Sequence, residues 1–389
     1  MSYSLFAVTT PGLEPFTQAE LAAMGINSRL PQYKNTPGEP HEESGGVEFE
    51  ASLYDLYRTN LHLRTANRIL ARLGEFYAAA FSELRKKAAR LPWDLYLKPG
   101  QPVSLRVTCH KSRLYHSDAV AERIAGAIND ALGKPVPVVK TSSSDEQVKR
   151  NMLPRLVIVR LVHDQCTISL DTSGELLHRR GYRLETAKAP LRETLAAGLL
   201  LAAGWDITAP LMDPFCGSGT IPIEAALMAS RIAPGKNRHF AFMDWPDFDS
   251  KLWQTCYAEA LAGEVPIAGP ILASDRDAGA IRIAQANAER ANLLAYIQFS
   301  CRAFSAIEPP AGPGWIVTNP PYGVRVSPSH DLRNLYTHLG DVLRALCPGW
   351  QIGILCASDF LAGHTRLQFD RTLPLVNGGI PVKFFIGKV

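Results

Sequence analysis

The sequence predicts an α/β protein whose carboxy-terminal half forms a nucleotide-binding sheet. Two βα units support this fold class: apolar strands at residues 211–212 and 271–274 each run through a turn into a helix, over residues 221–232 and 278–292. A third apolar run, residues 315–318, ends at Asn-Pro-Pro and indicates a further buried strand. At 389 residues the chain is too long for one ordinary core, so two or three domains are expected.

The bulk composition is that of a globular protein. Hydrophobic residues make up 46% of the chain and charged residues 20%, and the net charge of +4 points only weakly to a polyanionic partner. No run reaches the roughly 18 apolar residues of a membrane span, and residues 1–4 lack a secretory signal's basic region, so we expect a cytoplasmic protein with no membrane partner. Seven scattered cysteines, never spaced Cys-x-x-Cys, argue against a disulfide framework or a metal site. No heptad pattern demands a dimer, so a monomer is expected.

The amino-terminal end predicts a small α/β unit. A strand over residues 5–9 stops at a Pro-Gly pair and precedes a helix over residues 13–24. A second strand over residues 45–50 and a helix over residues 52–63 repeat the pattern. The polar residues 32–44 are expected to form the loop between the two pairs.

A second unit follows, and its composition is basic from Phe81 onward. Ser117 or Asp118 is expected to cap its helix. The predicted elements are a strand, a helix and a closing hairpin of two strands, over residues 103–108, 119–132, 155–162 and 166–171.

The turn before that helix carries residues suited to a nucleic acid. Lys111 and Arg113 lie beside the helix start, where free amides, the helix dipole and two cations would hold a phosphate. Tyr115, His110 and His116 could stack on or hydrogen-bond an unpaired nucleotide. The alternative is a solvated basic surface, which is the commoner fate of a short cationic cluster.

A basic linker, residues 174–183, joins the two halves of the chain. Its Arg179, Arg180 and Arg183 could neutralise phosphates in a cleft between domains. They could equally hold the domains to each other. The sequence leaves both interpretations open.

The first βα unit of the carboxy-terminal half contains a ligand-binding turn. A helix that begins at Pro190 precedes the unit. The turn consists of Asp213, Pro214, Phe215, Cys216, Gly217, Ser218, Gly219 and Thr220. No Lys-Ser/Thr pair follows the glycines and the third glycine of a dinucleotide site is missing, which argues against a P-loop and a dinucleotide. Asp213 would repel a pyrophosphate but attract an α-ammonium group, which indicates an amino-acid-bearing cofactor such as S-adenosylmethionine.

The second βα unit places two acidic residues after its strand. Asp275 suits the two hydroxyls of a ribose, and Asp277 is expected to cap the following helix. Between the two units, residues 233–253 mix cations with aromatic side chains. This insertion could flank a substrate entrance or form a satellite hydrophobic cluster.

The strand over residues 315–318 opens into the predicted reaction centre. The residues that follow it are Asn319, Pro320, Pro321 and Tyr322. Two prolines fix φ and hold the neighbouring carbonyl groups outward. Together with the Asn319 amide oxygen and the flat face of Tyr322, these carbonyls could cradle an exocyclic amine on a ring. Taken alone, the tetrapeptide could be a simple strand-terminating turn.

Two groups of motifs resemble known families. The segment His-Lys-Ser-Arg-Leu-Tyr-His-Ser-Asp, set between a strand and a helix, resembles the core of a THUMP domain, an RNA-binding module. The motifs Asp-Pro-Phe-Cys-Gly-Ser-Gly-Thr, Ser-Asp-Arg-Asp and Thr-Asn-Pro-Pro-Tyr-Gly, in this order, resemble class I methyltransferases that modify exocyclic amines. With Pro-Leu-Arg-Glu-Thr-Leu-Ala-Ala between the two groups, nearly the whole chain is similar to the RNA guanine-N2 methyltransferase family.

The resemblance implies a division of the chain. An amino-terminal ferredoxin-like domain would span residues 1–65 and be partly continuous with a THUMP RNA-binding domain over residues 66–172. A linker over residues 173–188 would lead to a Rossmann-like methyltransferase domain over residues 189–389 with a seven-stranded sheet.

The tail of the chain fits this sheet. It predicts strands over residues 351–357, 369–375 and 381–386, with Asn-Gly-Gly at residues 377–379 as a hairpin turn between the last two. A reversed final strand beside a parallel sheet suits a methyltransferase better than a dehydrogenase.

The resemblance also implies which residues act. S-adenosylmethionine would be held by the eight turn residues 213–220 and by Pro190, Thr194, Leu195, Ala196, Asp275, Arg276, Ala303, Phe304 and Asn319. RNA would be held by Lys111, Arg113, Tyr115, His116, Arg179, Arg180 and Arg183, and catalysis would fall to Asn319, Pro320, Pro321 and Tyr322. The family usually has an aspartate where this chain has Ala303, so adenine binding would rest on backbone amides near Phe304 and on apolar packing.

The predicted function is methyl transfer to the N2 amine of a guanosine in structured RNA, either large-subunit ribosomal RNA or tRNA near its acceptor stem. Adenine-N6 methylation is the nearest rival, because the same tetrapeptide serves both amines, and the RNA-capture module argues against DNA. A non-catalytic RNA-binding protein is supported only by Ala303. An NAD-dependent enzyme is disfavoured by the glycine pattern.

Overall fold

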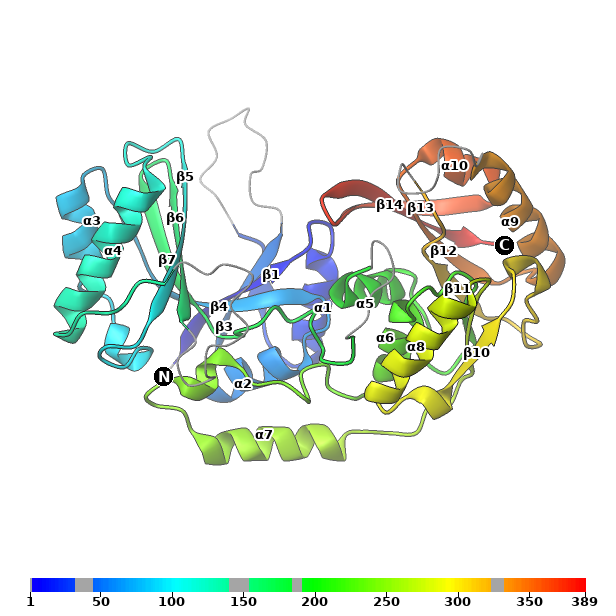
Figure 1. Ribbon diagram of the computed structural model, residues 1–389, viewed down its shortest axis with the longest axis horizontal. Helices are drawn as coiled ribbons and strands as arrows, with labels where there is room; N and C mark the ends of the chain where they lie inside the picture. Colours follow the sequence, from blue (N-terminus) through cyan, green and yellow to red (C-terminus); the bar gives the residue numbers. More distant parts are fainter. Residues whose placement is uncertain (1, 32–44, 140–153, 184–190, 323–331) are drawn as a thin grey trace.

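The chain folds into two seven-stranded sheets placed end to end in an elongated molecule (Figure 1). This computed structural model describes residues 2–31, 45–139, 154–183, 191–322 and 332–389. The loop predicted over residues 32–44 lies outside the described residues. Within these described segments no helix is long and apolar enough to cross a membrane.

The first sheet joins both amino-terminal units in the strand order β2-β3-β1-β4-β7-β6-β5. The junction is β4 (Ala66–Tyr77), whose first half pairs with β1 (Tyr3–Thr9) and whose second half pairs with β7 (Gln165–Asp171). The remaining strands are β2 (Ser28–Arg29), β3 (Gly46–Ala51), β5 (Val103–His110) and β6 (Arg155–Val162). Because one long strand serves both units, they share a continuous backbone ladder.

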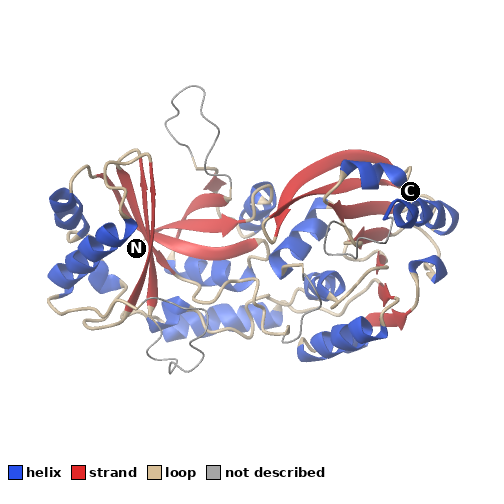
Figure 2. Ribbon diagram, turned by 45° about the horizontal axis from the view of Figure 1, so that its top comes forward, coloured by secondary structure: helices blue, strands red, loops and turns tan. Residues whose placement is uncertain are grey.

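Helices cover this sheet in two pairs. They are α1 (Glu14–Ala23) and α2 (Leu53–His62) on the first unit, and α3 (Phe81–Ala88) and α4 (Ser117–Leu132) on the outer side of the second (Figure 2). The residue before α4 is His116, which makes no side-chain cap. The prediction that Ser117 or Asp118 caps α4 is wrong, because both residues already lie in its first turn, where Asp118 is placed near the positive end of the helix dipole.

The second sheet has the order β10-β9-β8-β11-β12-β14-β13. The first five strands in this order, from β10 through β12, run parallel to one another. Strand β14 runs antiparallel to its neighbours β12 and β13, so the predicted reversal is confirmed. The predicted hairpin turn is also confirmed, with φ of 59° at Gly378 and 84° at Gly379. The strands are β8 (Leu211–Asp213), β9 (Ile271–Asp275), β10 (Ile297–Cys301), β11 (Trp315–Thr318), β12 (Gln351–Cys356), β13 (Gln368–Asn377) and β14 (Ile380–Lys388).

The topology of this second sheet gathers the predicted site at one edge. Because β8, β9, β10 and β11 are parallel, their carboxyl ends meet there, and ligands of such sheets bind outside these ends. The helices of this half are α5 (Glu193–Ala202), α6 (Thr220–Ala229), α7 (Ser250–Ala262), α8 (Ala278–Arg290), α9 (Leu332–Leu346) and α10 (Asp359–His364).

The insertion over residues 233–253 packs onto the amino-terminal half. Phe242 stacks on Tyr57 of α2 with 4.6 Å between ring centroids, and Trp253 of α7 meets the same ring edge-on at 5.9 Å. Helix α7 itself contacts α2 (Figure 1). The insertion is therefore part of the hydrophobic core of the amino-terminal half and does not form a separate satellite cluster. Because the insertion connects elements of the carboxy-terminal half, this packing holds the two halves together.

The linker arginines Arg180 and Arg183 pack against the carboxy-terminal half, with Arg180 buried and Arg183 partly buried. The Arg180 guanidinium lies 3.4 Å from Glu224 on α6, with side chains only 2% and 0% exposed. Arg183 donates a hydrogen bond to Thr220 Oγ1 at 2.7 Å and lies 3.3 Å from Glu193. The predicted contact of Arg180 with RNA is wrong, because its guanidinium is buried. Arg180 instead holds the domains together, since it contacts both Glu224 and the Arg64 carbonyl. The contact of Arg183 with RNA stays a prediction.

Candidate active site

The glycine turn after β8 is bound to the end of β9. Asp275 Oδ2 accepts the N–H of Gly217 at 3.0 Å, and Cys216 donates its N–H to Ser274 O at 3.0 Å. Gly217 and Gly219 have φ of 52° and 82°, a backbone region that favours glycine. Asp275 therefore lies beside the turn, and its other carboxylate oxygen, Oδ1, accepts the N–H of Asp277 at 3.0 Å. Asp277 accepts two N–H groups of α8, which confirms the predicted cap.

Asp213 is a buried carboxylate between two strand ends. Its Oδ1 accepts both the Thr318 hydroxyl at 2.7 Å and the Phe215 N–H at 3.1 Å. These two bonds, from described residues, leave Oδ2 available to a ligand donor. Burial, together with a smaller effect from the negative charge of Asp275, raises the pKa of Asp213 to about 7, although the hydrogen bonds from Thr318 and Phe215 oppose this rise. The bond to Thr318 joins the end of β8 to the end of β11, one residue before Asn319.

The Asn-Pro-Pro-Tyr loop is held from two sides. Tyr336 of α9 donates its hydroxyl to Pro321 O at 3.3 Å, and Asn377 at the end of β13 donates to the Tyr322 hydroxyl at 3.0 Å. The Asn319 amide oxygen is buried, and it accepts no hydrogen bond from the residues that the structure describes. Buried polar atoms nearly always have a partner, so an orphan acceptor at this edge marks a place for a ligand donor.

Three contributors to this site, Thr318, Tyr336 and Asn377, were missed by the sequence analysis. Thr318 was assigned only as the end of a strand and Asn377 only as a turn residue. Tyr336 is completely buried in the apolar face of α9, and nothing in its neighbouring sequence distinguishes it from a core residue.

Aromatic rings cover the turn from the side of β10. Phe304, which follows β10, stacks on Phe215 of the turn with 5.2 Å between centroids, and His338 of α9 meets Phe304 edge-on at the same separation. Ala303 is exposed, and its side chain cannot form hydrogen bonds. Arg276, which follows β9, is also exposed. The structure therefore brings Ala303, Phe304 and Arg276 to the same edge as the glycine turn.

The first turn of α5 is not brought to an accessible surface. Thr194, Leu195 and Ala196 are each at most 1% exposed. The Thr194 hydroxyl donates a hydrogen bond to Asn67 Oδ1 on β4 at 2.8 Å. These residues support the turn from inside the core. Pro190 lies outside the described residues.

The predicted RNA contacts of the second unit lie at the far end of the first sheet. The side chain of Arg113 is 72% exposed, although a carboxylate lies 3.6 Å away. Arg179, which lies in the linker and not in this unit, is 66% exposed. Tyr115 is 69% exposed and its ring lies 4.1 Å from that of His116. Lys111 sits in the turn with a φ of 46°.

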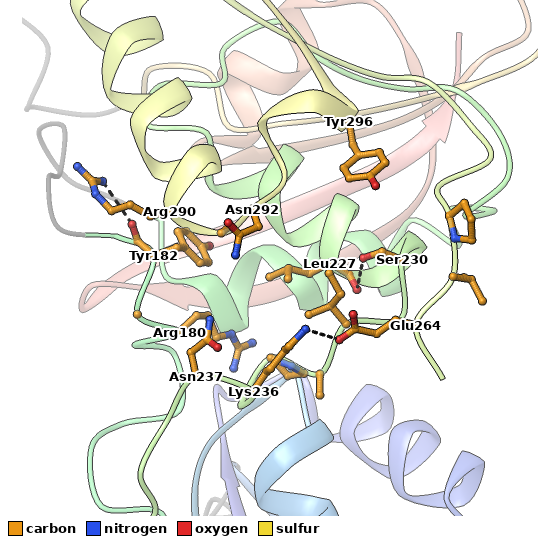
Figure 3. A pocket seen from close by; sticks show the side chains of 17 residues that line it. Arg180, Tyr182, Leu227, Ser230, Lys236, Asn237, Glu264, Arg290, Asn292 and Tyr296 are labelled. Atoms are coloured by element: carbon orange, nitrogen blue, oxygen red, sulfur yellow. Dashed lines mark hydrogen bonds and ion pairs between the residues drawn. The ribbon is translucent and has the colours of Figure 1, made fainter. Parts of the chain in front are cut away.

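A cavity of about 500 Å³ lies elsewhere, between the linker, α6 and the end of α8 (Figure 3). Arg290 and Asn292 come from the end of α8, and Tyr296 immediately precedes β10. The cavity is therefore at the amino-terminal edge of the parallel strands, opposite the glycine turn. Lys236 and Glu264 on its wall pair with each other at 2.6 Å, and the cavity is separate from the candidate active site.

The fold and the site together define a class. Six strands of one direction with an antiparallel β14 between β12 and β13, a glycine turn after the first strand and an acid after the second make this half a class I S-adenosylmethionine-dependent methyltransferase domain. Comparison with known families agrees. Residues 180–384 match the RMKL-like methyltransferase domain, residues 4–70 the RlmL ferredoxin-like domain and residues 78–171 the THUMP domain. The chain belongs to the RMKL-like methyltransferase family.

Similar proteins cover the chain from end to end. A Synechocystis protein named as an RNA methyltransferase is 35% identical, over 97% of this chain and 94% of its own length. A ribosomal RNA large subunit methyltransferase K/L of Methylococcus capsulatus is also 35% identical over 99% of this chain, but the chain spans only about half, 51%, of that relative. Among solved structures, the methyltransferase SMU.472 complexed with SAH is 28% identical with a TM-score of 0.85, and the match covers 99% and 97% of the two chains.

Proposed function

We propose that this protein transfers a methyl group from S-adenosylmethionine to the N2 amine of a guanosine in structured RNA. The observation that carries the proposal is the buried Asn319 Oδ1, which accepts no hydrogen bond from the described residues. This oxygen lies at the same edge of the sheet as the glycine turn. An exocyclic amine offers two N–H groups and would supply that donor. The names of the relatives and the THUMP match support an RNA substrate.

The residues at the glycine turn fit the proposed cofactor. Asp213 Oδ2 would accept the α-ammonium group, and Asp275 would accept the ribose hydroxyls. In place of a carboxylate at Ala303, the stacked Phe304 and Phe215 supply a flat apolar surface for adenine. The cofactor supplies an electrophilic methyl group on its sulfonium.

The Asn-Pro-Pro-Tyr loop would orient the amine. Asn319 Oδ1 and the Pro320 carbonyl accept its two hydrogens, which directs the nitrogen lone pair toward the methyl group. Tyr322 stacks on the extruded base. No general base is required before transfer, because the amine loses its proton after it has gained the methyl group.

Large-subunit ribosomal RNA is the substrate we propose, because it is the RNA in the names of the K/L relatives. Arg113, Tyr115 and His116 are exposed at the opposite end of the molecule and would contact a second region of the same RNA. A substrate that reaches both ends must be a folded RNA rather than a short oligonucleotide.

Mass spectrometry of nucleosides from a deletion strain tests the function. We expect N2-methylguanosine to decrease in large-subunit ribosomal RNA and to return with the wild-type gene. A decrease in N6-methyladenosine instead would replace guanine by adenine as the target. Unchanged methylation of every ribosomal RNA and tRNA would contradict the proposal.

The affinity for S-adenosylmethionine is expected to fall as the pH falls below 7. The pKa of the Asp213 carboxyl, raised to about 7 by burial, means that acid protonates the group and removes the charge that would attract the ammonium. Competition with one proton weakens binding roughly tenfold per pH unit below the pKa. Calorimetric titrations between about pH 7.5 and 5.5 measure this dependence, and Asp213→Asn should bind weakly with a flat profile. A wild-type affinity that does not vary with pH would exclude Asp213 from this role.

A further inference from the structure

The tip of the β13–β14 hairpin reaches the predicted reaction centre. Asn377, the last residue of β13, donates its side-chain N–H to the Tyr322 hydroxyl, with 3.0 Å between Nδ2 and the oxygen. Gly378 and Gly379 then reverse the chain with positive φ, so the hairpin ends at this contact. Leu373 and Ile380, on the two strands beside the turn, belong with Tyr322 to the apolar layer around the same core.

The same hairpin rests on the ferredoxin-like domain. Gly12 has a φ of 93°, and a Cβ on this residue would lie 2.4 Å from the Pro374 carbonyl oxygen of β13. Leu13 and Leu375, which are 0% and 3% exposed, belong to one buried cluster with the partly buried Tyr322 packed against it. Leu13 also fills the space above Gly198 of α5, because a Cβ on Gly198 would lie 2.6 Å from Leu13 Cδ1. The Gly12–Leu13 corner is therefore fitted closely between the hairpin and α5.

We propose that Asn377 is a positioning residue for Tyr322 and that the Gly12–Leu13 corner holds the hairpin where this contact forms. The inference rests on the proposed function, in which Tyr322 stacks on the target base. The ring of Tyr322 is fixed at its backbone end by Pro321 and at its hydroxyl end by Asn377, so the stacking surface is oriented before the base arrives. The amino-terminal half thus sets the geometry of methyl transfer in addition to any affinity for RNA.

A double-mutant cycle tests the contact between the two side chains. Asn377→Ala and Tyr322→Phe should each lower kcat about three- to tenfold, the size expected for one neutral hydrogen bond, with the KM for S-adenosylmethionine unchanged. The double variant should lose no more than either single variant, because both substitutions remove the same bond. Asn377→Gln, which keeps a donor, should recover part of the loss. Val376→Thr, at an exposed neighbouring position of β13, is the matched control and should keep the wild-type kcat.

Hydrogen exchange without RNA tests the link to the ferredoxin-like domain. In Gly12→Ala the new Cβ displaces the hairpin, so exchange at the amides of Tyr322 and Ile380 should rise roughly threefold or more, while exchange in β9 stays unchanged. A wild-type protein that methylates no RNA would overturn the proposed function, and the exchange measurement would still decide this inference. Unchanged exchange at Tyr322 in both Gly12→Ala and Asn377→Ala would overturn the inference, as would additive kcat losses in the cycle.

Discussion

Asn319→Ala is expected to lower kcat for methyl transfer by about a hundred- to a thousandfold, the cost of removing one preorganised hydrogen-bonding group from a reaction centre. Within the described residues the Asn319 Oδ1 atom accepts no hydrogen bond, so alanine breaks no bond to this oxygen that supports the fold. Affinity for S-adenosylmethionine should stay close to that of the wild type, because Asp213 and Asp275 lie on other strands. Single-turnover transfer of a labelled methyl group measures the loss, and calorimetry measures the affinity.

Two variants accompany this substitution. Asn319→Asp keeps an acceptor at the same place and should retain more activity than the alanine variant. Asn237→Ala changes an exposed asparagine on the wall of the cavity in Figure 3 and should keep full activity, because that cavity is at the opposite edge of the sheet. Full activity of Asn319→Ala, or an equal loss in Asn237→Ala, would refute the role of the loop.

The edge of the second sheet could be predicted because its signals are local. A strand, its turn and the following helix are contiguous in sequence, and the parallel topology then places the turns after β8, β9 and β11 side by side. The bond between Asp213 and Thr318 is a consequence of that topology, since each is the last residue of a neighbouring strand. Gly378 and Gly379 were predictable in the same way, from the chemistry of tight turns.

The contacts that hold Tyr322 could not be predicted because they join distant positions. Tyr336 is 15 residues from Pro321, and Asn377 is 55 residues from Tyr322. An asparagine before two glycines is equally consistent with a plain turn, and only the folded hairpin shows that its amide reaches the reaction centre. The orphan oxygen of Asn319 likewise becomes visible only when every neighbouring donor has been placed.

The linker shows the same limit for charge. Three arginines lie within five residues of the linker, yet Arg180 is buried, Arg183 is partly buried and Arg179 is exposed. Glu224, which pairs with Arg180, is 44 residues away on α6. Local sequence therefore cannot separate a guanidinium that stabilises a domain interface from one that is available to a phosphate.

Arg180→Met is expected to lower the free energy of unfolding by about 3–5 kcal/mol, because it removes the ion-pair partner of the buried Glu224 carboxylate. The Tyr182 hydroxyl, 3.1 Å from the same carboxylate, and the nearby positive charge of Arg64 would remain. The substitution also removes the hydrogen bond from Arg180 to the Arg64 carbonyl, which ties the linker to the ferredoxin-like domain. Urea unfolding followed by circular dichroism measures the change.

Arg179→Met is the matched control, since its side chain is 66% exposed and its nearest carboxylate is 3.9 Å away. Its free energy of unfolding should stay within about 0.5 kcal/mol of the wild-type value. The double variant Arg180→Met with Glu224→Met should recover much of the stability lost in Arg180→Met, because a buried pair can often be replaced by apolar side chains of similar volume. If Arg180→Met is as stable as Arg179→Met but binds RNA less tightly, the guanidinium acts on RNA and the two halves are held together by the Tyr57–Phe242 cluster instead.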